Sequence, residues 1–195
     1  MCLILVAWQQ HPSYPLIVAA NRDEFYARPT LPAARWQDVP AEATEADIHG
    51  GRDLEAGGTW LGYARGGRFA AVTNVREPGR PPGLGRRGEQ DADQERDDGF
   101  NLLVSDGEAL VYCTNRGAAT MSLEPGIYGL SNHLLDTPWP KLASSKERFA
   151  AALGALPADE AFFALLSDDE IVPDPLLPAT GVPLAWERIL SAVFV

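Results

Sequence analysis

The sequence predicts an α+β fold with a largely antiparallel sheet. Short apolar segments typical of strands fill the first two thirds of the chain, and helical periodicity begins only near residue 141. Strands that precede helices, rather than alternate with them, favour α+β proteins over parallel α/β proteins. With 195 residues and no internal repeat, the chain is expected to form a single domain, 1–195, with a sizeable core.

The chain begins with two apolar strands joined by a polar turn. Residues 3–8 (LILVAW) and 15–20 (PLIVAA) predict the strands, and the QQHPSY segment between them predicts the turn. The second strand runs directly into residues 21–24, Asn-Arg-Asp-Glu. Because a β-hairpin returns its second strand to the start of its first, we expect this tetrapeptide to lie near residue 2.

The middle of the chain mixes strands and loops. Residues 27–57 are rich in Pro, Ala and acidic residues without periodicity, which predicts mostly loop. Residues 77–98 contain one leucine and no other large apolar side chain, which predicts a mobile charged loop. Further strands are expected within 57–62, 67–75, 100–106, 108–115 and 126–132.

The last part of the chain predicts two helices and a final strand. Residues 141–153 place apolar side chains near one face, and Gly154 is expected to end this helix. Residues 157–166 open with Pro and acidic residues, as helix N-termini prefer. Residues 185–195 are interpreted as a strand, and because the chain ends while still apolar we expect further sequence beyond Val195.

Composition and charge exclude several classes of protein. The net charge of −11 argues against a nucleic-acid partner or an anionic membrane surface. No apolar stretch approaches the roughly 20 residues of a membrane span, and the start lacks the basic region of a secretory signal, so we expect a cytoplasmic protein. Two cysteines without metal-ligand spacing predict neither a disulfide framework nor a metal site.

Residues 83–88 match the dinucleotide-binding pattern G-x-G-x-x-G by letter only. That pattern binds a cofactor when a strand precedes it and a helix follows it. Here Pro81 and Pro82 precede it and a charged run follows, so we favour a flexible loop and expect no cofactor.

The position of Cys2 allows a chemistry that only a chain terminus provides. Methionine aminopeptidases remove Met1 before small residues, so the mature chain would begin with Cys2. Its α-amino group, with a pKa of about 7.7–8.0, can accept the proton of a thiol whose pKa is about 8.5. Arg22, returned to residue 2 by the hairpin, would favour the thiolate. The alternative is a buried structural cysteine.

Other polar residues stand at the ends of apolar strands. Residues 21–24 form either a solvated turn with an ion pair or the lining of a site. Asn74 and Asn132 each end a predicted strand. Asparagine stabilises turns by bonding nearby backbone, and its amide can also donate to a developing oxyanion. The residues themselves leave both alternatives open.

Taken together, the Met-Cys start and five further segments resemble the NRDE-motif family, whose eukaryotic members are called transport and Golgi organisation proteins. The segments are ANRDEFYARPT, GGTWLGY, AAVTNVREP, GFNLLVSD and GLSNHLLDTPWPK. That family is similar to N-terminal-nucleophile (Ntn) hydrolases of the choloylglycine hydrolase and penicillin V acylase type. The resemblance therefore implies an Ntn-hydrolase-like αββα sandwich.

This sequence differs from the family pattern at two places. The loop 77–98 is shorter than a helix-bearing insertion of the family, and the chain stops before a Tyr-Gly-Thr-Arg-like segment. We therefore expect thinned outer layers and the loss of one basic residue of the site.

The resemblance assigns roles to five residues. Cys2 takes the place of the nucleophile, and its α-amino group takes the place of the base. Arg22 lies where the hydrolases have an arginine beside the thiol, and Asp23 lies roughly where they have an aspartate near the amine. Asn74 and Asn132 fall at positions that resemble the two oxyanion-hole asparagines.

The activity that the resemblance implies is hydrolysis of a linear, non-peptide C–N amide bond in a small molecule. The eukaryotic members imply an alternative, a non-catalytic carrier of an apolar ligand such as haem, a lipid or an acyl-CoA. A third possibility is an incomplete relative without activity of its own. We expect no bound cofactor and no metal site.

Overall fold

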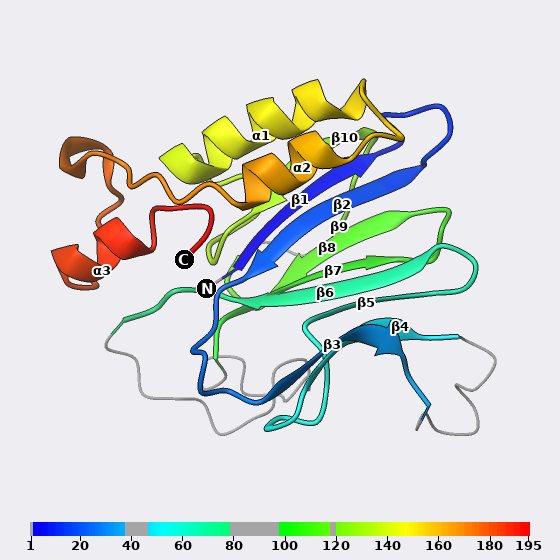
Figure 1. The fold of residues 1–195 in the computed structure, drawn as a ribbon, viewed down its shortest axis with the longest axis horizontal. Coiled ribbons are helices and arrows are strands. Elements are labelled where there is room, and N and C mark those ends of the chain that lie inside the picture. The colour runs from blue at the N-terminus through cyan, green and yellow to red at the C-terminus, as the bar shows by residue number, and fades with distance from the viewer. Residues whose placement is uncertain (1, 38–46, 79–97, 118–119) are drawn as a thin grey trace.

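Two antiparallel sheets stack face to face, and helices cover the outer side of one of them (Figure 1). The computed structural model describes residues 2–37, 47–78, 98–117 and 120–195. The strands are β1 (Cys2–Trp8), β2 (Leu16–Arg22), β3 (Thr30–Arg35), β4 (His49–Asp53), β5 (Leu61–Ala64), β6 (Arg68–Asn74), β7 (Phe100–Ser105), β8 (Leu110–Thr114), β9 (Met121–Ser122) and β10 (Gly126–Leu130). The helices are α1 (Pro140–Leu153), α2 (Glu160–Leu166) and α3 (Leu184–Ile189), with a short 3-10 turn at Asp174–Leu176.

The strand β1 is the centre of the smaller sheet, whose order is β10-β1-β2. Every residue of β1 is buried. Because successive side chains of a strand point to opposite faces, Leu3 and Leu5 pack beneath α1 and α2, whereas Ile4 and Val6 pack against the second sheet. Burial on both faces explains why this strand is apolar without alternation.

The second sheet has the order β3-β4-β5-β6-β7-β8-β9. In β6 and β7 buried residues alternate with more exposed ones. Phe69 and Ala71 of β6 and Leu103 of β7 face the smaller sheet and join its core. The main core therefore lies between the two sheets, and a second core lies between the smaller sheet and the helices.

Helices α1 and α2 lie across the outer face of the smaller sheet (Figure 1). Leu142 and Phe149 of α1 are buried against this sheet, and the ring of Phe162 on α2 meets Phe149 edge-on at 5.5 Å. Pro140 opens α1, and Gly154 caps its C-terminal end. The predicted end of the first helix is confirmed, and the second helix begins three residues later than predicted.

The segment 27–57, which predicts mostly loop, also contains two strands that the sequence did not indicate, β3 and β4. Strand β3 lies at the edge of the larger sheet, and all six of its residues are exposed. An exposed edge strand carries no buried face, so no apolar alternation marks it in the sequence.

The prediction of a final strand at 185–195 is also wrong. The segment begins with helix α3, followed by a bend in which Ala192 and Val193 are buried. The carboxylate of Glu187 in α3 points inward and accepts a hydrogen bond of 2.8 Å from Arg76, a residue far from it in the sequence. Short apolar segments do not distinguish strand from buried coil by periodicity alone.

The predicted α+β class with mainly antiparallel sheets is confirmed. The described residues form three layers, helix on sheet on sheet. The predicted mobile loop at 77–98 falls almost wholly on residues 79–97, which lie outside the described part of the chain. None of the helices in the described ranges is long and apolar enough to cross a bilayer.

Candidate functional site

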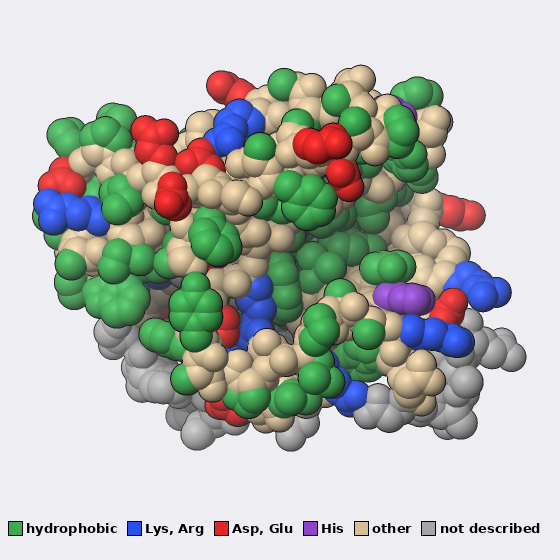
Figure 2. All heavy atoms as spheres, viewed as in Figure 1, with side chains coloured by type: hydrophobic (Ala, Val, Ile, Leu, Met, Phe, Trp, Pro, Cys, Tyr) green, Lys and Arg blue, Asp and Glu red, His purple; other side chains and the backbone are tan. Residues whose placement is uncertain are grey.

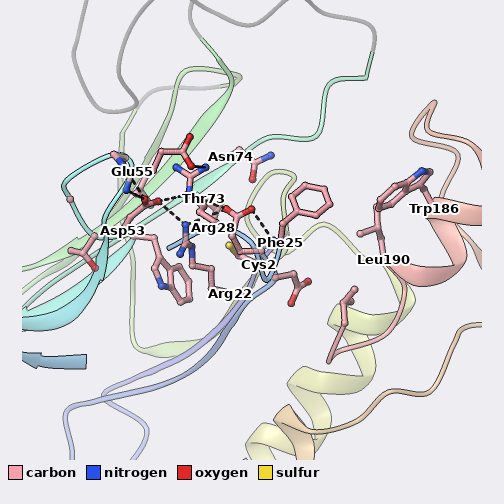
Figure 3. Close-up of a pocket in the computed structure, with 18 residues that line it drawn as sticks. Cys2, Arg22, Phe25, Arg28, Asp53, Glu55, Thr73, Asn74, Trp186 and Leu190 are labelled. Atoms are coloured by element: carbon pink, nitrogen blue, oxygen red, sulfur yellow. Dashed lines mark hydrogen bonds and ion pairs between the residues drawn. The ribbon is translucent and has the colours of Figure 1, made fainter. Parts of the chain in front are cut away.

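A cavity of about 710 Å³ opens where β1 begins and β2 ends (Figure 3). Its wall is formed by the start of β1, the polar residues at the end of β2, the β4–β5 turn, the end of β6 and the C-terminal segment. The lining residues are Cys2, Arg22, Asp23, Glu24, Phe25, Arg28, Asp53, Glu55, Ala56, Gly58, Thr59, Trp60, Val72, Thr73, Asn74, Trp186, Leu190 and Val195. Four of the five predicted site residues line this cavity, and Asn132 lies behind it.

Cys2 occupies the first position of the central strand β1 and is only 8% exposed. Its backbone nitrogen donates a hydrogen bond to Oδ1 of Asn132 at 2.7 Å. This nitrogen is a peptide amide while Met1 is attached, and it stands where the α-amino group lies once Met1 is removed. Across the hairpin, Cys2 is paired with Arg22, so the predicted proximity of these two residues is confirmed.

Asn132 and Asn74 are brought together from different sheets. Asn132 follows β10 in the left-handed conformation, with φ of 53°, and is completely buried. Its Nδ2 donates to Oδ1 of Asn74 at 2.7 Å and to the Asn74 carbonyl at 3.2 Å. The Asn132 amide therefore bridges Cys2 and Asn74, whereas Asn74 itself faces the cavity.

Arg22 belongs to a charged cluster on the cavity wall. Its Nη2 donates to Asp53 at 2.8 Å and to Glu24 at 3.2 Å, and Arg28 Nε donates to the same oxygen of Asp53 at 2.8 Å. Burial acts to raise the pKa of Asp53, but the amide of Ala56, the Arg28 guanidinium and a further backbone amide lower it to about 2. Asp53 is therefore ionised at neutral pH and holds Arg22 in place.

Asp23 lies deeper than Arg22, beside a buried lysine. The side chains of Asp23 and Lys141 are 8% and 3% exposed, and Lys141 Nζ lies 4.0 Å from Oδ2 of Asp23. Burial raises the pKa of Asp23, and the Lys141 ammonium opposes this rise. The site therefore contains a buried cation that opposes the neutralisation of Asp23.

Apolar side chains surround the mouth of the cavity. Phe25 is 72% exposed and Trp186 is 47% exposed, and both line the cavity (Figure 3). Apolar side chains gather over the α3 end of the molecule, where the C-terminal segment lies (Figure 2). The site thus combines a polar floor with an apolar rim.

A family model described as Transport and Golgi organisation 2 matches residues 1–96 and 85–195. The chain belongs to the Transport and Golgi organisation 2 family. The predicted membership of the transport and Golgi organisation family is therefore confirmed.

Two relatives show how far the likeness to this Transport and Golgi organisation 2 chain extends. The Transport and Golgi organization protein 2 homolog of Bos taurus is 37% identical over 216 residues, covering 93% of this chain and 77% of the bovine protein. The Transport and Golgi organization protein 2 of Drosophila melanogaster is 30% identical over 192 residues, covering 80% of this chain and 66% of the fly protein.

Sequence reasoning missed two residues of this family member's site. Asp53 ends β4, within the segment that predicts mostly loop, so nothing local indicates that it meets Arg22. Lys141 stands at the start of α1, where a lysine is normally solvated. In both cases the contact joins residues more than 30 positions apart.

Within the described ranges, no group of three or more His, Cys, Asp or Glu side chains is arranged to hold a metal ion. The other cysteine, Cys113, lies on β8 outside the cavity lining, and burial raises the pKa of its thiol.

Proposed function

We propose that this Transport and Golgi organisation 2 family member is an Ntn hydrolase that cleaves a linear, non-peptide C–N amide bond with Cys2 as nucleophile. One observation carries the proposal: the Cys2 nitrogen bonds to Asn132 at 2.7 Å, at the base of a cavity that Arg22 and Asn74 also line. The stacked antiparallel sheets, with Cys2 at the start of a central strand, support the Ntn-like arrangement.

The first chemical step forms a thioester. After removal of Met1, the free α-amino group takes the proton of the Cys2 thiol, directly or through a water molecule. The thiolate attacks the amide carbonyl carbon, a C–S bond forms, and the carbonyl electron pair moves onto oxygen. The C–N bond then breaks, and the amine leaves with the proton held by the α-ammonium group.

The second step releases the acid. The α-amino group takes a proton from water as the water oxygen attacks the thioester carbonyl. The C–S bond breaks, the carboxylic acid departs, and the proton returns to the Cys2 sulfur. Water is the only co-reactant, and no electron transfer occurs.

The surrounding residues have separate roles in this mechanism. The Asn74 amide faces the cavity and can donate to the oxyanion, because a preorganised donor stabilises charge that develops in the transition state. Asn132 holds the amino group of Cys2 rather than donating into the cavity. The Arg22 guanidinium favours the thiolate, and Asp23 offers a carboxylate to the α-ammonium group.

The cavity suggests an apolar acyl group. Its volume of about 710 Å³ suits a small molecule. Val72, Trp186, Leu190 and Val195 provide apolar walls. Arg28 and Asp53 lie across the cavity from Trp186 (Figure 3). An apolar acyl chain against these walls would leave the amide near Cys2.

The test begins with the intact mass of the purified protein, which should correspond to a chain starting at Cys2. Turnover is then measured on a panel of N-acyl amides with acyl chains of increasing length. Cys2→Ala should abolish turnover, whereas Cys113→Ala, outside the cavity, should retain it. A retained Met1, or equal turnover in Cys2→Ala, would rule out the mechanism.

A second candidate is a carrier of an apolar ligand such as haem, a lipid or an acyl-CoA. The exposed aromatic side chains of Phe25 and Trp186 at the rim favour it, because apolar surface of this kind commonly marks a binding site. A carrier would bind ligand equally well as wild type and as Cys2→Ala, without turnover in either form. A hydrolase would instead lose turnover on this substitution.

A further inference from the structure

The C-terminal segment forms one wall of the cavity, through Trp186, Leu190 and Val195. Two polar side chains hold this segment against the hairpin. Asn21 Nδ2 donates to the carbonyl of Leu166 at 2.7 Å and to that of Val193 at 3.0 Å. The other is Lys141, whose contacts join the wall to the site.

The Lys141 ammonium group contacts both the C-terminal segment and Asp23. Nζ donates to the carbonyl of Leu190 at 3.0 Å and to that of Ala192 at 2.9 Å. On the other side it lies 4.0 Å from the Asp23 carboxylate. Two of the three N–H donors of the ammonium therefore bond to carbonyl oxygens, and the Asp23 carboxylate is an ion-pair partner beyond hydrogen-bond distance.

We propose that Lys141 is a positioning residue of the site, whose ammonium holds the C-terminal wall of the cavity and whose positive charge favours the ionised forms of Asp23 and Cys2. The inference rests on the proposed function in that it takes this cavity to be the place where the amide binds. Lys141 supplies this buried cation from the start of α1.

The electrostatic surroundings fit this role. The charged or ionisable groups that act on Lys141 are Asp23, Arg76 and Cys2. Burial lowers the pKa of Lys141 to about 8, and Asp23 opposes this while Arg76 adds to it. Arg76 is itself paired with Glu187 of α3 at 2.8 Å, so part of its charge is balanced. At pH 7 Lys141 is therefore mainly charged.

Burial makes this charge significant. A buried ion pair is costly to form, but removing one partner leaves the other unpaired and is strongly destabilising. Replacement of Lys141 by an apolar side chain would remove one nearby cation from Asp23 and one donor from the carbonyls of Leu190 and Ala192. Both changes affect residues that line the cavity, because Asp23 and Leu190 belong to its lining.

The first experiment compares Lys141→Met, Lys141→Arg and Lys146→Met with the unsubstituted protein. Lys146 is on the same helix and pairs with Asp136 at the surface, so its variant is a matched control. Hydrogen exchange followed by mass spectrometry should show at least about fivefold faster exchange at residues 190–194 in Lys141→Met. Lys146→Met should exchange like the unsubstituted protein.

A second readout separates positioning from a merely structural role. The pH dependence of Cys2 alkylation by iodoacetamide is measured by peptide mass spectrometry in the same proteins. In Lys141→Met the midpoint should move to higher pH by about half a unit or more, because a nearby cation favours the thiolate. Lys141→Arg should restore the midpoint. An unchanged midpoint together with unchanged exchange would overturn the proposal.

A third measurement serves if Lys141→Met does not fold. The Lys141 side chain is titrated by ¹³C NMR of lysine Cε in the unsubstituted protein and in Asp23→Asn. We expect a pKa near 8 that falls further in Asp23→Asn, because the carboxylate raises it. An ordinary lysine pKa, or no change on substitution, would overturn the proposal. None of the three readouts uses amide turnover, so failure of the proposed function would be seen separately.

Discussion

Cys2 and Asn132, 130 residues apart in sequence, are joined by a hydrogen bond of 2.7 Å from the Cys2 nitrogen to the Asn132 side chain. Because Asn132 also donates to Asn74, a single buried amide connects the start of β1, the end of β10 and the end of β6. The two sheets thus meet at the proposed nucleophile.

Asn132→Gly should reduce turnover and stability together. Glycine accepts the left-handed backbone of this position, so the variant removes the amide without adding strain. Loss of a buried hydrogen-bonding group should lower the free energy of unfolding by about 1–3 kcal/mol. Urea denaturation and steady-state kinetics measure both effects. Asn132→Ala should be less stable than Asn132→Gly, and the reverse order would contradict the backbone argument.

Asn74→Ala should act mainly on kcat. If the Asn74 amide stabilises the oxyanion, its removal should lower kcat on the order of 10²–10³-fold with little change in KM. Kinetics on the best amide of the panel measure this split. A rise in KM at constant kcat would instead assign Asn74 to substrate binding.

Asp53→Asn should remove an acid-dependent part of the stability. The pKa of Asp53 is lowered from 3.8 to about 2 in the folded protein, so the unfolded chain binds its proton first. The stability that Asp53 contributes is therefore complete above about pH 4 and is lost as the pH falls toward 2. Urea denaturation at pH 5, 4 and 3 should show a steeper decline in the unsubstituted protein than in Asp53→Asn. Parallel declines would contradict the assignment.

Lys141→Met should remove a rise in stability at alkaline pH. The pKa of Lys141 falls from 10.5 to about 8 on folding, so between these values the unfolded chain binds more protons than the folded one. The unfolding free energy contributed by this group therefore increases from about pH 8 to 10.5. The comparison of Lys141→Met with Lys146→Met over this range isolates the effect. Equal pH dependence in the two variants would show that Lys141 has an ordinary pKa.

Trp186→Ala should weaken the binding of long acyl chains. Trp186 lines the cavity and is 47% exposed, so its removal takes apolar contact from the substrate with little cost to the fold. Loss of about 1 kcal/mol of contact corresponds to a rise in KM of about fivefold. Phe163→Ala, an exposed aromatic of α2 outside the cavity lining, is the control. The effect should vanish for the shortest acyl amides.

Much of the site could be predicted because its central part is a hairpin of residues that are close together in the sequence. The apolar residues of β1, the short polar turn and the apolar residues of β2 predict a hairpin, and a hairpin of this length brings Arg22 back to Cys2. The structure adds that Asn74 and Asn132 contact each other. The sequence placed each at a strand end, but their contact depends on how the two sheets stack.

Other parts of the site could not be predicted because their signals are not local. Asp53 ends a strand whose edge partner β3 is fully exposed, so no apolar periodicity indicated either strand. Lys141 has the sequence context of a surface residue and is buried only because the C-terminal segment folds over it.

The sequence by itself determined the α+β class, the N-terminal hairpin and the family, because these depend on local apolar patterns and on contiguous motifs. The tertiary structure decided which side chains meet Cys2 and which cations and carboxylates are buried with it. Burial and ion pairing depend on contacts between residues far apart in the chain, so Asn132, Asp53 and Lys141 acquire their roles only when the sheets and the C-terminal segment pack together.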